Sequence, residues 1–210
     1  MTPKELFYEN RGLNTVKQLR LRHFDAQYCK TAQEAKEAAL ALIGEGKTVG
    51  WGGSATMDSL GIKEVLRQKG QPLFDRDTAK TPEEVETAMK KSLTADVFLM
   101  SSNAITEDGV LVNLDGRGNR VAALTYGAER VIVIAGMNKV VPTVEDGIAR
   151  TRHYAAPMNA QRFGGTPCAV TGCCADCKSE SCICCSLVIT RMCRIPGRIH
   201  VILVGEDLGM

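Results

Sequence analysis

Short apolar runs of β-prone residues alternate with helix start signals along most of this chain. The runs are TVGW at 48–51, DVFLMS at 96–101, VLVNL at 110–114 and RVIVIAG at 130–136. Several are apolar at consecutive positions, which is typical of strands that helices cover on both faces. Strands that alternate with helices form βαβ units, so the sequence predicts an α/β fold with a mostly parallel sheet and helices on both faces.

Threonine residues mark the starts of two predicted helices. Thr31 begins T-A-Q-E and Thr81 begins T-P-E-E. Each is a capping box, in which the hydroxyl and the carboxylate three residues later satisfy backbone amides at the helix start. A third helix is predicted over 144–163 with a bend at Pro157, and a helical segment is expected at the N-terminus, over about 1–24.

The C-terminal part has a different pattern. The runs SLVITRMC and RIHVILVG flank the tetrapeptide R-I-P-G at 194–197. We interpret them as a β-hairpin at the edge of the sheet. The chain has no internal repeat and no linker-like tract, so residues 1–210 are predicted to form one domain.

The net charge and the hydropathy of the chain limit its expected partners and location. The 26 basic and 24 acidic residues leave a net charge of +2, which gives no electrostatic case for binding nucleic acid or an anionic membrane. The first 24 residues contain no apolar segment of the kind found in signal peptides, and no apolar run reaches the length of a membrane span. We therefore expect a cytoplasmic protein.

A glycine-rich turn follows the first apolar run, in V-G-W-G-G-S-A-T-M-D at 49–58. Small residues between a strand and a helix leave backbone N–H groups uncovered, and these groups favour an anion. The motif is neither a Walker motif nor the full dinucleotide fingerprint. The alternative is a tight turn in which Ser54 only caps the helix. The candidate ligand-binding residues are Gly52, Gly53, Ser54, Ala55 and Thr56.

Polar residues also crowd the segment 101–120, after the second run. Ligands of open α/β sheets bind beyond the carboxyl ends of strands, which makes Ser102, Asn103, Asn119 and Arg120 candidate ligand-binding residues. Adjacent carboxylates can act in acid–base or nucleophilic catalysis, so Glu107 and Asp108 are candidate catalytic residues. The alternative is that E-D-G forms a hairpin turn. Asn138 and Lys139 follow the fourth run, again at a strand's carboxyl end, where they could contact a ligand. The alternative, which we expect for Lys139, is a solvated loop residue.

Eight of the nine cysteines fall between Cys168 and Cys193, most of them in a predicted cysteine-rich loop at about 164–186. A reducing cytosol argues against structural disulfides. Thiolates at this spacing suit tetrahedral zinc or an iron–sulfur cluster. A redox-active disulfide and free thiols packed as small hydrophobic groups are the alternatives.

Long stretches of the sequence resemble the lactate-utilisation (LUD) family. They include VGWGGSATMDSLG, ADVFLMSSNAITEDGVLVNLDGRGNRVAALTYGAERVIVIAGMNKVV and GRIHVILVGEDLGM. The resemblance implies a fold like that of ribose-5-phosphate isomerase, glucosamine-6-phosphate deaminase and the CoA transferases. Only Glu107 loosely matches the CoA-transferase nucleophile, so the resemblance transfers no catalytic residue.

The resemblance also implies a pathway and partners. LUD proteins are linked to L-lactate oxidation together with iron–sulfur oxidoreductase subunits, which implies a small anionic substrate. Members similar to this chain carry C-x5-C-x2-C-x6-C, which falls here on Cys168, Cys174, Cys177 and Cys184. These are the implied ligands of an iron–sulfur cluster, or alternatively of zinc.

Two hypotheses for the function follow. The first is a component of lactate or related organic-acid oxidation that binds a small anion and a metal centre. The second is a non-catalytic metal-binding protein that transfers electrons or docks partners. The oligomeric state is left open, with a homo-oligomer among the alternatives.

Overall fold

The computed structural model describes all 210 residues and contains a six-stranded sheet in which every neighbouring pair is parallel. Its strand order is β1-β10-β7-β4-β2-β3. The strands are β1 (Asp25–Cys29), β2 (Val49–Trp51), β3 (Leu73–Phe74), β4 (Val97–Met100), β7 (Arg130–Gly136) and β10 (Ile199–Val204). The predicted α/β fold with a mostly parallel sheet is confirmed.

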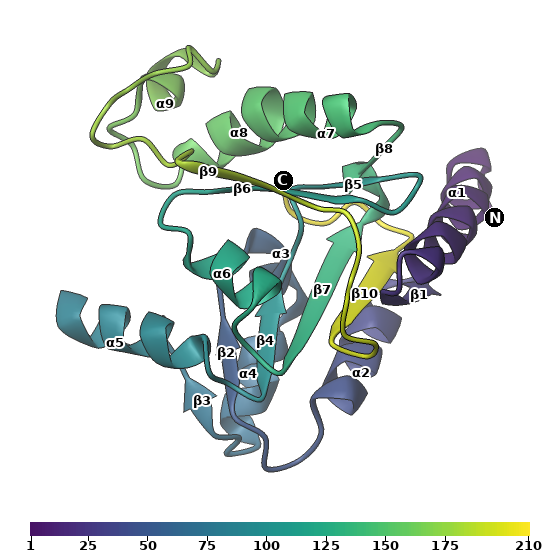
Figure 1. The fold of residues 1–210 in the computed structure, drawn as a ribbon, viewed down its shortest axis with the longest axis horizontal. Coiled ribbons are helices and arrows are strands. Elements are labelled where there is room, and N and C mark those ends of the chain that lie inside the picture. The colour runs from purple at the N-terminus through teal and green to yellow at the C-terminus, as the bar shows by residue number, and fades with distance from the viewer.

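A second, four-stranded sheet was not predicted. It contains β5 (Ala104–Thr106), β6 (Leu111–Asp115), β8 (Val140–Val141) and β9 (Ser186–Thr190), in the order β8-β5-β6-β9. β6 is antiparallel to both β5 and β9, and β8 is parallel to β5. This sheet lies between the first sheet and helices α7 to α9 (Figure 1).

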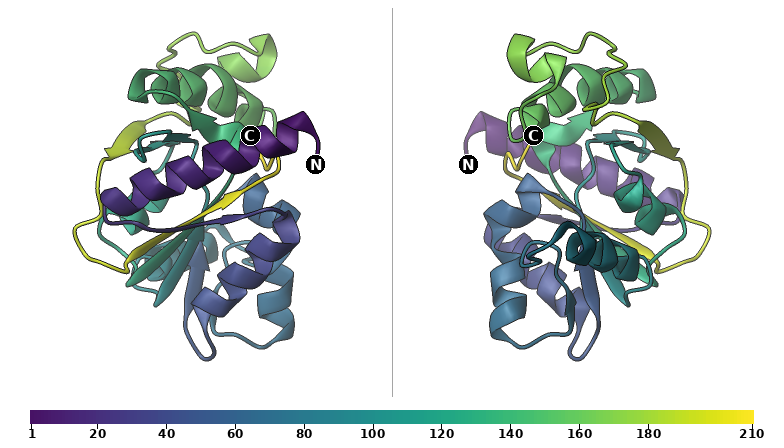
Figure 2. Two further views of the ribbon diagram at one scale, coloured as in Figure 1. Left: turned by 90° about the vertical axis from the view of Figure 1, so that its right-hand side faces the viewer. Right: turned by 90° about the vertical axis from the view of Figure 1, so that its left-hand side faces the viewer.

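Nine α-helices surround the sheets. They are α1 (Pro3–Leu21), α2 (Ala32–Ile43), α3 (Ala55–Leu60), α4 (Ile62–Gln68), α5 (Pro82–Ser92), α6 (Asn119–Thr125), α7 (Val144–Arg150), α8 (Ala156–Ala160) and α9 (Pro167–Thr171). The side views show α1 across the molecule between the first sheet and the outer helices (Figure 2). None of these helices has the length and hydrophobicity that a membrane span requires.

The capping threonines lie where the sequence placed them. Thr81 forms a complete capping box with Glu84, whose carboxylate accepts from the Thr81 amide. Thr31 accepts from the Glu34 amide, but the Glu34 carboxylate accepts from the amide of Lys30 instead. Both threonines therefore start helices by satisfying amides that lack partners within the helix.

The predicted third helix is continuous but not uniform. α7 passes into a π-helical turn at Thr151–Ala155, which leads into α8. Pro157 follows this turn and has no N–H to donate to the preceding turn. A local π-helical turn is one of the ways in which a helix adapts to such an interruption.

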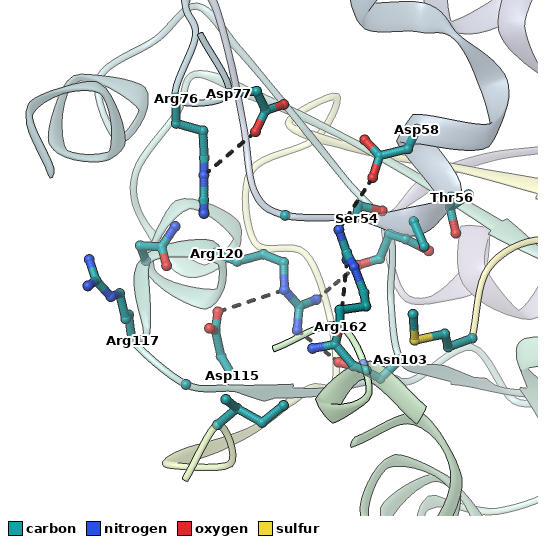
Figure 3. A pocket seen from close by; sticks show the side chains of 18 of the residues that line it. Ser54, Thr56, Asp58, Arg76, Asp77, Asn103, Asp115, Arg117, Arg120 and Arg162 are labelled. Carbon is teal, nitrogen blue, oxygen red and sulfur yellow. Dashed lines mark hydrogen bonds and ion pairs between the residues drawn. The ribbon is translucent and has the colours of Figure 1, made fainter. Parts of the chain in front are cut away.

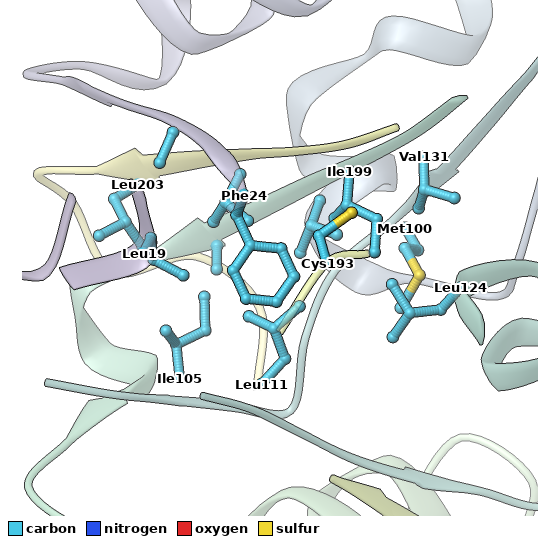
Figure 4. Close-up of a cluster of buried hydrophobic side chains, with 14 of the residues drawn as sticks. Leu19, Phe24, Met100, Ile105, Leu111, Leu124, Val131, Cys193, Ile199 and Leu203 are labelled. Atoms are coloured by element: carbon cyan, nitrogen blue, oxygen red, sulfur yellow. The ribbon is translucent and has the colours of Figure 1, made fainter. Parts of the chain in front are cut away.

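Two apolar clusters pack on opposite faces of the parallel sheet. Val131 and Val133 of β7 face α1, α6 and the second sheet, whereas Ile132 and Ile134 face α2, α3 and α4. Figure 4 shows the first cluster, in which Phe24 lies among side chains of both sheets. Each fully buried aliphatic side chain contributes about 1.5–3 kcal/mol to folding. Both clusters pack on the parallel sheet, so this sheet lies at the centre of the core.

The predicted C-terminal hairpin is wrong. β9 pairs with β6 in the second sheet, and β10 lies between β1 and β7 in the first. β10 is buried at five of its six positions, which suits an interior parallel strand, whereas burial alternates along β9, the edge strand of its sheet. The segment 191–198 therefore connects two sheets.

Candidate functional site

A cavity of about 950 Å³ opens beyond the carboxyl ends of β2 and β4, between the parallel sheet and the second sheet. Eight of the nine predicted ligand-binding residues line it: Gly53, Ser54, Ala55, Thr56, Ser102, Asn103, Asn119 and Arg120. The structure thus brings the glycine turn and the segment 101–120 together at one pocket. Gly52 is the exception, because it lies beneath the side chain of Arg120.

Arg120 organises the wall of this pocket. Its guanidinium donates to the Ser101 carbonyl at 2.9 Å, to Asn103 Oδ1 at 2.8 Å and to Asn113 Oδ1 at 2.6 Å, and it lies 3.7 Å from an Asp115 carboxylate oxygen. Burial lowers the pKa of Arg120, and Asp115 opposes that change. Figure 3 shows Arg120 between Asn103 and Asp115. A Cβ on Gly52 would lie 3.1 Å from the Arg120 side chain.

Ser102 and Asn103 are held by backbone groups. The Ser102 hydroxyl donates to the Ala104 carbonyl at 2.8 Å, and Asn103 Oδ1 accepts from the Leu114 amide at 3.0 Å. These bonds fix the start of the β5–β6 hairpin against Arg120. Asn113 belongs to β6 of this hairpin, and its buried Nδ2 has no hydrogen-bond partner.

Lys139 is buried, and its expected place in a solvated loop is wrong. It is 4% exposed and lies in a short 3₁₀ turn after β7. Its amine donates to Thr56 Oγ1 and to Ser101 Oγ, each at 2.9 Å, and no carboxylate pairs with it. Burial, together with the charges of Arg150 and Arg120, lowers its pKa to about 7. The one indication in the sequence that Lys139 could lie at the pocket was its position after the carboxyl end of a strand.

Basic side chains outnumber acidic ones around the pocket. The acidic side chains are Asp58, Glu64, Asp77 and Asp115, and the basic ones are Lys63, Arg67, Arg76, Arg117, Arg120, Lys139 and Arg162. Figure 3 shows Arg76, Arg117 and Arg162 around Arg120. Seven basic side chains against four acidic ones give the pocket an excess of positive charge, which favours an anion.

Lys63 provides a contrast with Lys139 inside the same pocket. It is equally buried, but its amine lies 2.7 Å from Asp58 and 2.6 Å from Asp77. Two carboxylates therefore compensate the charge of Lys63, as is usual for a buried lysine. Lys139 lacks such compensation.

Glu107 and Asp108 do not reach the pocket. Thr106 N bonds to the Val110 carbonyl, and the two carboxylates project from the hairpin turn between β5 and β6 toward α1. Glu107 pairs with Arg11 at 2.7 Å, and Asp108 pairs with Arg22 just beyond the end of α1. A hydrogen bond from Thr106 and the charge of Arg22 lower the pKa of Asp108. E-D-G is a hairpin turn anchored to the N-terminal helix.

A second cavity, of about 260 Å³, gathers six thiols. It is lined by Cys168, Cys174, Cys177, Cys182, Cys184 and Cys185, with apolar side chains such as Pro157 and Leu187. Cys173 is exposed and outside it, while Cys29 and Cys193 are buried elsewhere. All nine cysteines are free thiols. The four cysteines that the family resemblance implies thus share one cavity.

The chemistry of this cavity suits a thiolate-bound metal. Burial, together with the neighbouring Cys182, Cys168 and Cys174, raises the pKa of Cys184 to about 12. A metal cation would reverse this effect by stabilising the thiolates. No three Cys, His, Asp or Glu side chains already stand at ligand spacing, so the sulfur atoms must move closer to bind an ion.

The two cavities share a wall. Leu114 and Ile183 line both. The Cys185 amide donates to the Asp115 carbonyl at 3.0 Å, and a Cβ on Gly116 would lie 3.3 Å from the Ile183 backbone. The cysteine-rich segment is therefore packed against the turn that carries Asp115 and leads to Arg120.

Comparison with known proteins places the chain in a family. The crystal structure of a DUF162 family protein from Deinococcus radiodurans is similar over 95% of this chain and 98% of that one, with a TM-score of 0.52 and 13% identity, which shows a shared fold. eIF2B delta from Chaetomium thermophilum matches 50% of this chain and 47% of its own at 19% identity, with a TM-score of 0.32 that supports no argument. No curated protein sequence matches. The model of the LUD domain matches residues 14–204, so the chain belongs to the LUD domain family, which is associated with lactate utilisation.

Proposed function

We propose that this protein is a component of lactate or related organic-acid utilisation that binds a small carboxylate in the larger pocket and a metal centre in the cysteine cavity. The observation that carries the proposal is Lys139, a buried amine without a carboxylate partner in a pocket with excess positive charge. A bound carboxylate would offset this excess of positive charge in the pocket.

The walls of the pocket support a small polar ligand. Hydroxyls of Thr56 and Ser101 flank the amine, and Arg76 and Arg162 lie at the pocket with their nearest carboxylates at 3.9 and 3.7 Å. Such distances leave their N–H groups able to donate to a ligand, and charge-assisted bonds are about twice as strong as neutral ones. The fixed Arg120 holds this wall in place.

The cysteine cavity supports the metal part of the proposal. Cys168, Cys174, Cys177 and Cys184 would hold an iron–sulfur cluster, with zinc as the alternative. A bound iron–sulfur cluster supplies one-electron transfer. Since Leu114 and Ile183 alone line both cavities, the cysteine site would lie next to the bound acid. This proximity favours a shared role in oxidation.

The alternative function is a non-catalytic electron-transfer or docking protein. Exposed apolar side chains beside the cysteine-rich segment favour it: Phe163, Val170, Leu187 and Ile189 are 42–86% exposed. In that case the metal would be present, but the larger pocket would not bind organic acids.

Calorimetric titration with lactate and pyruvate tests the carboxylate pocket. We expect binding by the native protein and by Lys17→Met, a control that removes an exposed lysine of α1. Lys139→Met should bind about ten-fold more weakly, because a hydrogen bond to a charged group contributes about 1.5–3 kcal/mol. Equal affinity in Lys139→Met, or binding of neither acid, would contradict the carboxylate pocket and leave the alternative function.

A further inference from the structure

We propose that Lys139 is a nucleophile that condenses with the carbonyl carbon of a 2-oxo acid bound in the pocket. The inference rests on the proposed function, because it takes the pocket to be the site of a small carboxylate. It extends that function by naming the substrate class and a covalent step. A 2-oxo acid is the product of oxidising a 2-hydroxy acid, so the class is consistent with organic-acid oxidation.

The surroundings of Lys139 leave its amine free to react. Its hydrogen-bond partners are the hydroxyls of Thr56 and Ser101, which can accept from nitrogen and also donate to a carbonyl oxygen. Neither hydroxyl carries a negative charge that would stabilise the ammonium form of Lys139. Lys63 shows the opposite arrangement, because two carboxylates pair with its amine. Of these two buried lysines, only Lys139 lacks a carboxylate partner.

The charges around Lys139 favour its neutral form. Burial is the largest cause, and together with the charges of Arg150 in α7 and Arg120 in α6 it lowers the pKa of Lys139 to about 7. Exposed lysines have a pKa of about 10.4. At pH 7 the neutral fraction of Lys139 is therefore on the order of 1000-fold larger than that of a solvated lysine. Activation of lysine by burial near another cation is an established route to imine chemistry.

The segment 208–210 packs close to the Lys139 amine. Leu208 N donates to Asn138 Oδ1 at 3.1 Å, and Met210 lines the pocket. Gly209 has a φ of +62°, and a Cβ there would lie 2.5 Å from Thr56 Oγ1 and 3.3 Å from the Lys139 amine. This close approach helps to exclude water from the nitrogen while leaving its pocket side open.

The step balances without an oxidant or reductant. The nitrogen lone pair forms a bond to the carbonyl carbon, and the carbonyl π pair moves to oxygen, which takes up a proton. Loss of water from this carbinolamine gives the imine, and the two hydrogens of the amine leave in that water. The hydroxyls of Thr56 and Ser101 can pass these protons between nitrogen and oxygen.

Reductive trapping tests the proposal. The full chain is incubated at pH 7 with pyruvate and cyanoborohydride, which reduces an imine to a stable secondary amine. Peptide mass spectrometry then locates the adduct. We expect it at Lys139 and not at Lys63, and we expect none when lactate replaces pyruvate, because lactate has no carbonyl group to condense.

Lys139→Arg and calorimetry without reductant separate this inference from the proposed function. Arginine forms no imine, so this variant should give no adduct at position 139, while calorimetry on the native protein shows whether pyruvate binds. Pyruvate binding by the native protein without an adduct at Lys139 would overturn the nucleophile and leave the pocket. Adducts spread evenly over exposed lysines, or persisting in Lys139→Arg, would also overturn it. Binding of neither acid would overturn the pocket itself.

Discussion

Arg120 shows how much of the site depends on one residue. Its guanidinium joins the segment after β4, the end of β6 and the start of α6 through bonds to Ser101, Asn103 and Leu114. Gly52 makes room for its aliphatic part. The pocket wall is therefore assembled around an arginine from four otherwise separate segments.

Replacement of Arg120 by methionine should be strongly destabilising. It would remove the guanidinium donor from the Ser101 and Leu114 carbonyls and from two amide oxygens, each of which keeps one backbone donor. A buried group that is left unsatisfied costs about 1–3 kcal/mol. We expect a loss of about 3 kcal/mol in the free energy of unfolding, measured by urea denaturation. Arg117→Met is the matched control and should change it by less than about 0.5 kcal/mol, because Arg117 is exposed. Similar effects of the two variants would contradict this role.

Lys139 should make stability depend on pH. Its pKa of about 7 in the folded protein lies below about 10.4 for the unfolded chain, so the unfolded state binds more protons between these values. Stability therefore rises with pH across this window, and the penalty of charging Lys139 is complete below pH 7. Relative to Lys139→Met, the native protein should gain about 2 kcal/mol between pH 7 and 9. Parallel pH profiles from urea denaturation would refute this.

At the scale of elements, the cysteine-rich segment has little regular structure of its own. Between α9 and β9 it is joined to the rest of the molecule by few contacts, among them the Cys185 amide on Asp115 and the Arg152–Asp176 ion pair. Its four proposed ligands come from α9 and from the loop that follows. Metal binding should therefore order this segment without being needed for the two apolar clusters.

Anaerobic reconstitution with iron and sulfide, or with zinc, tests this expectation. The double variant Cys174→Ser, Cys177→Ser should lose bound metal and gain hydrogen exchange over 164–186, while the strands of the parallel sheet stay protected. Cys173→Ser is the matched control, since this exposed thiol adjoins Cys174 but lies outside the cavity, and it should keep its metal. Metal retained by the double variant, or absent from every form, would exclude the site.

At the scale of the whole molecule, the parallel sheet couples the two apolar clusters. Leu111 lies in the cluster beneath the second sheet, whereas Trp51 lies in the cluster beneath α2 to α4. Both pack on the same strands from opposite sides. The chain should therefore unfold as one cooperative unit.

Leu111→Ala tests that coupling, because Trp51 is the only tryptophan and reports on the other cluster. The truncation should cost about 2–5 kcal/mol, and it should shift the unfolding midpoint equally by Trp51 fluorescence and by far-UV circular dichroism. Leu187→Ala, which shortens a half-exposed side chain of β9, should have a small effect on both. A Trp51 transition that stays in place in Leu111→Ala would indicate two independently folding parts.

Features that depend only on neighbouring residues could be predicted from the sequence. Hydrogen bonds and apolar patterns a few residues long are enough to predict several elements. These are the helix starts at Thr31 and Thr81, the buried strands that end at Trp51 and Met100, and the turn at Gly53. Because parallel strands align their carboxyl ends at one edge of the sheet, the polar residues after them also meet in one pocket. Most of the candidate ligand residues could be predicted for that reason.

Tertiary structure alone decided which distant segments became neighbours. β9 and β10 look alike as apolar runs, but β10 fits between two parallel strands whereas β9 joins β6, so no hairpin forms. Glu107 and Asp108 have arginine partners only because α1 crosses the β5–β6 turn. Lys139 has the sequence context of a loop lysine, and its burial depends on Thr56, Ser101 and Gly209, which are 38 to 83 residues away along the chain. Burial and charge compensation are sums over such neighbours, and a local pattern does not contain them.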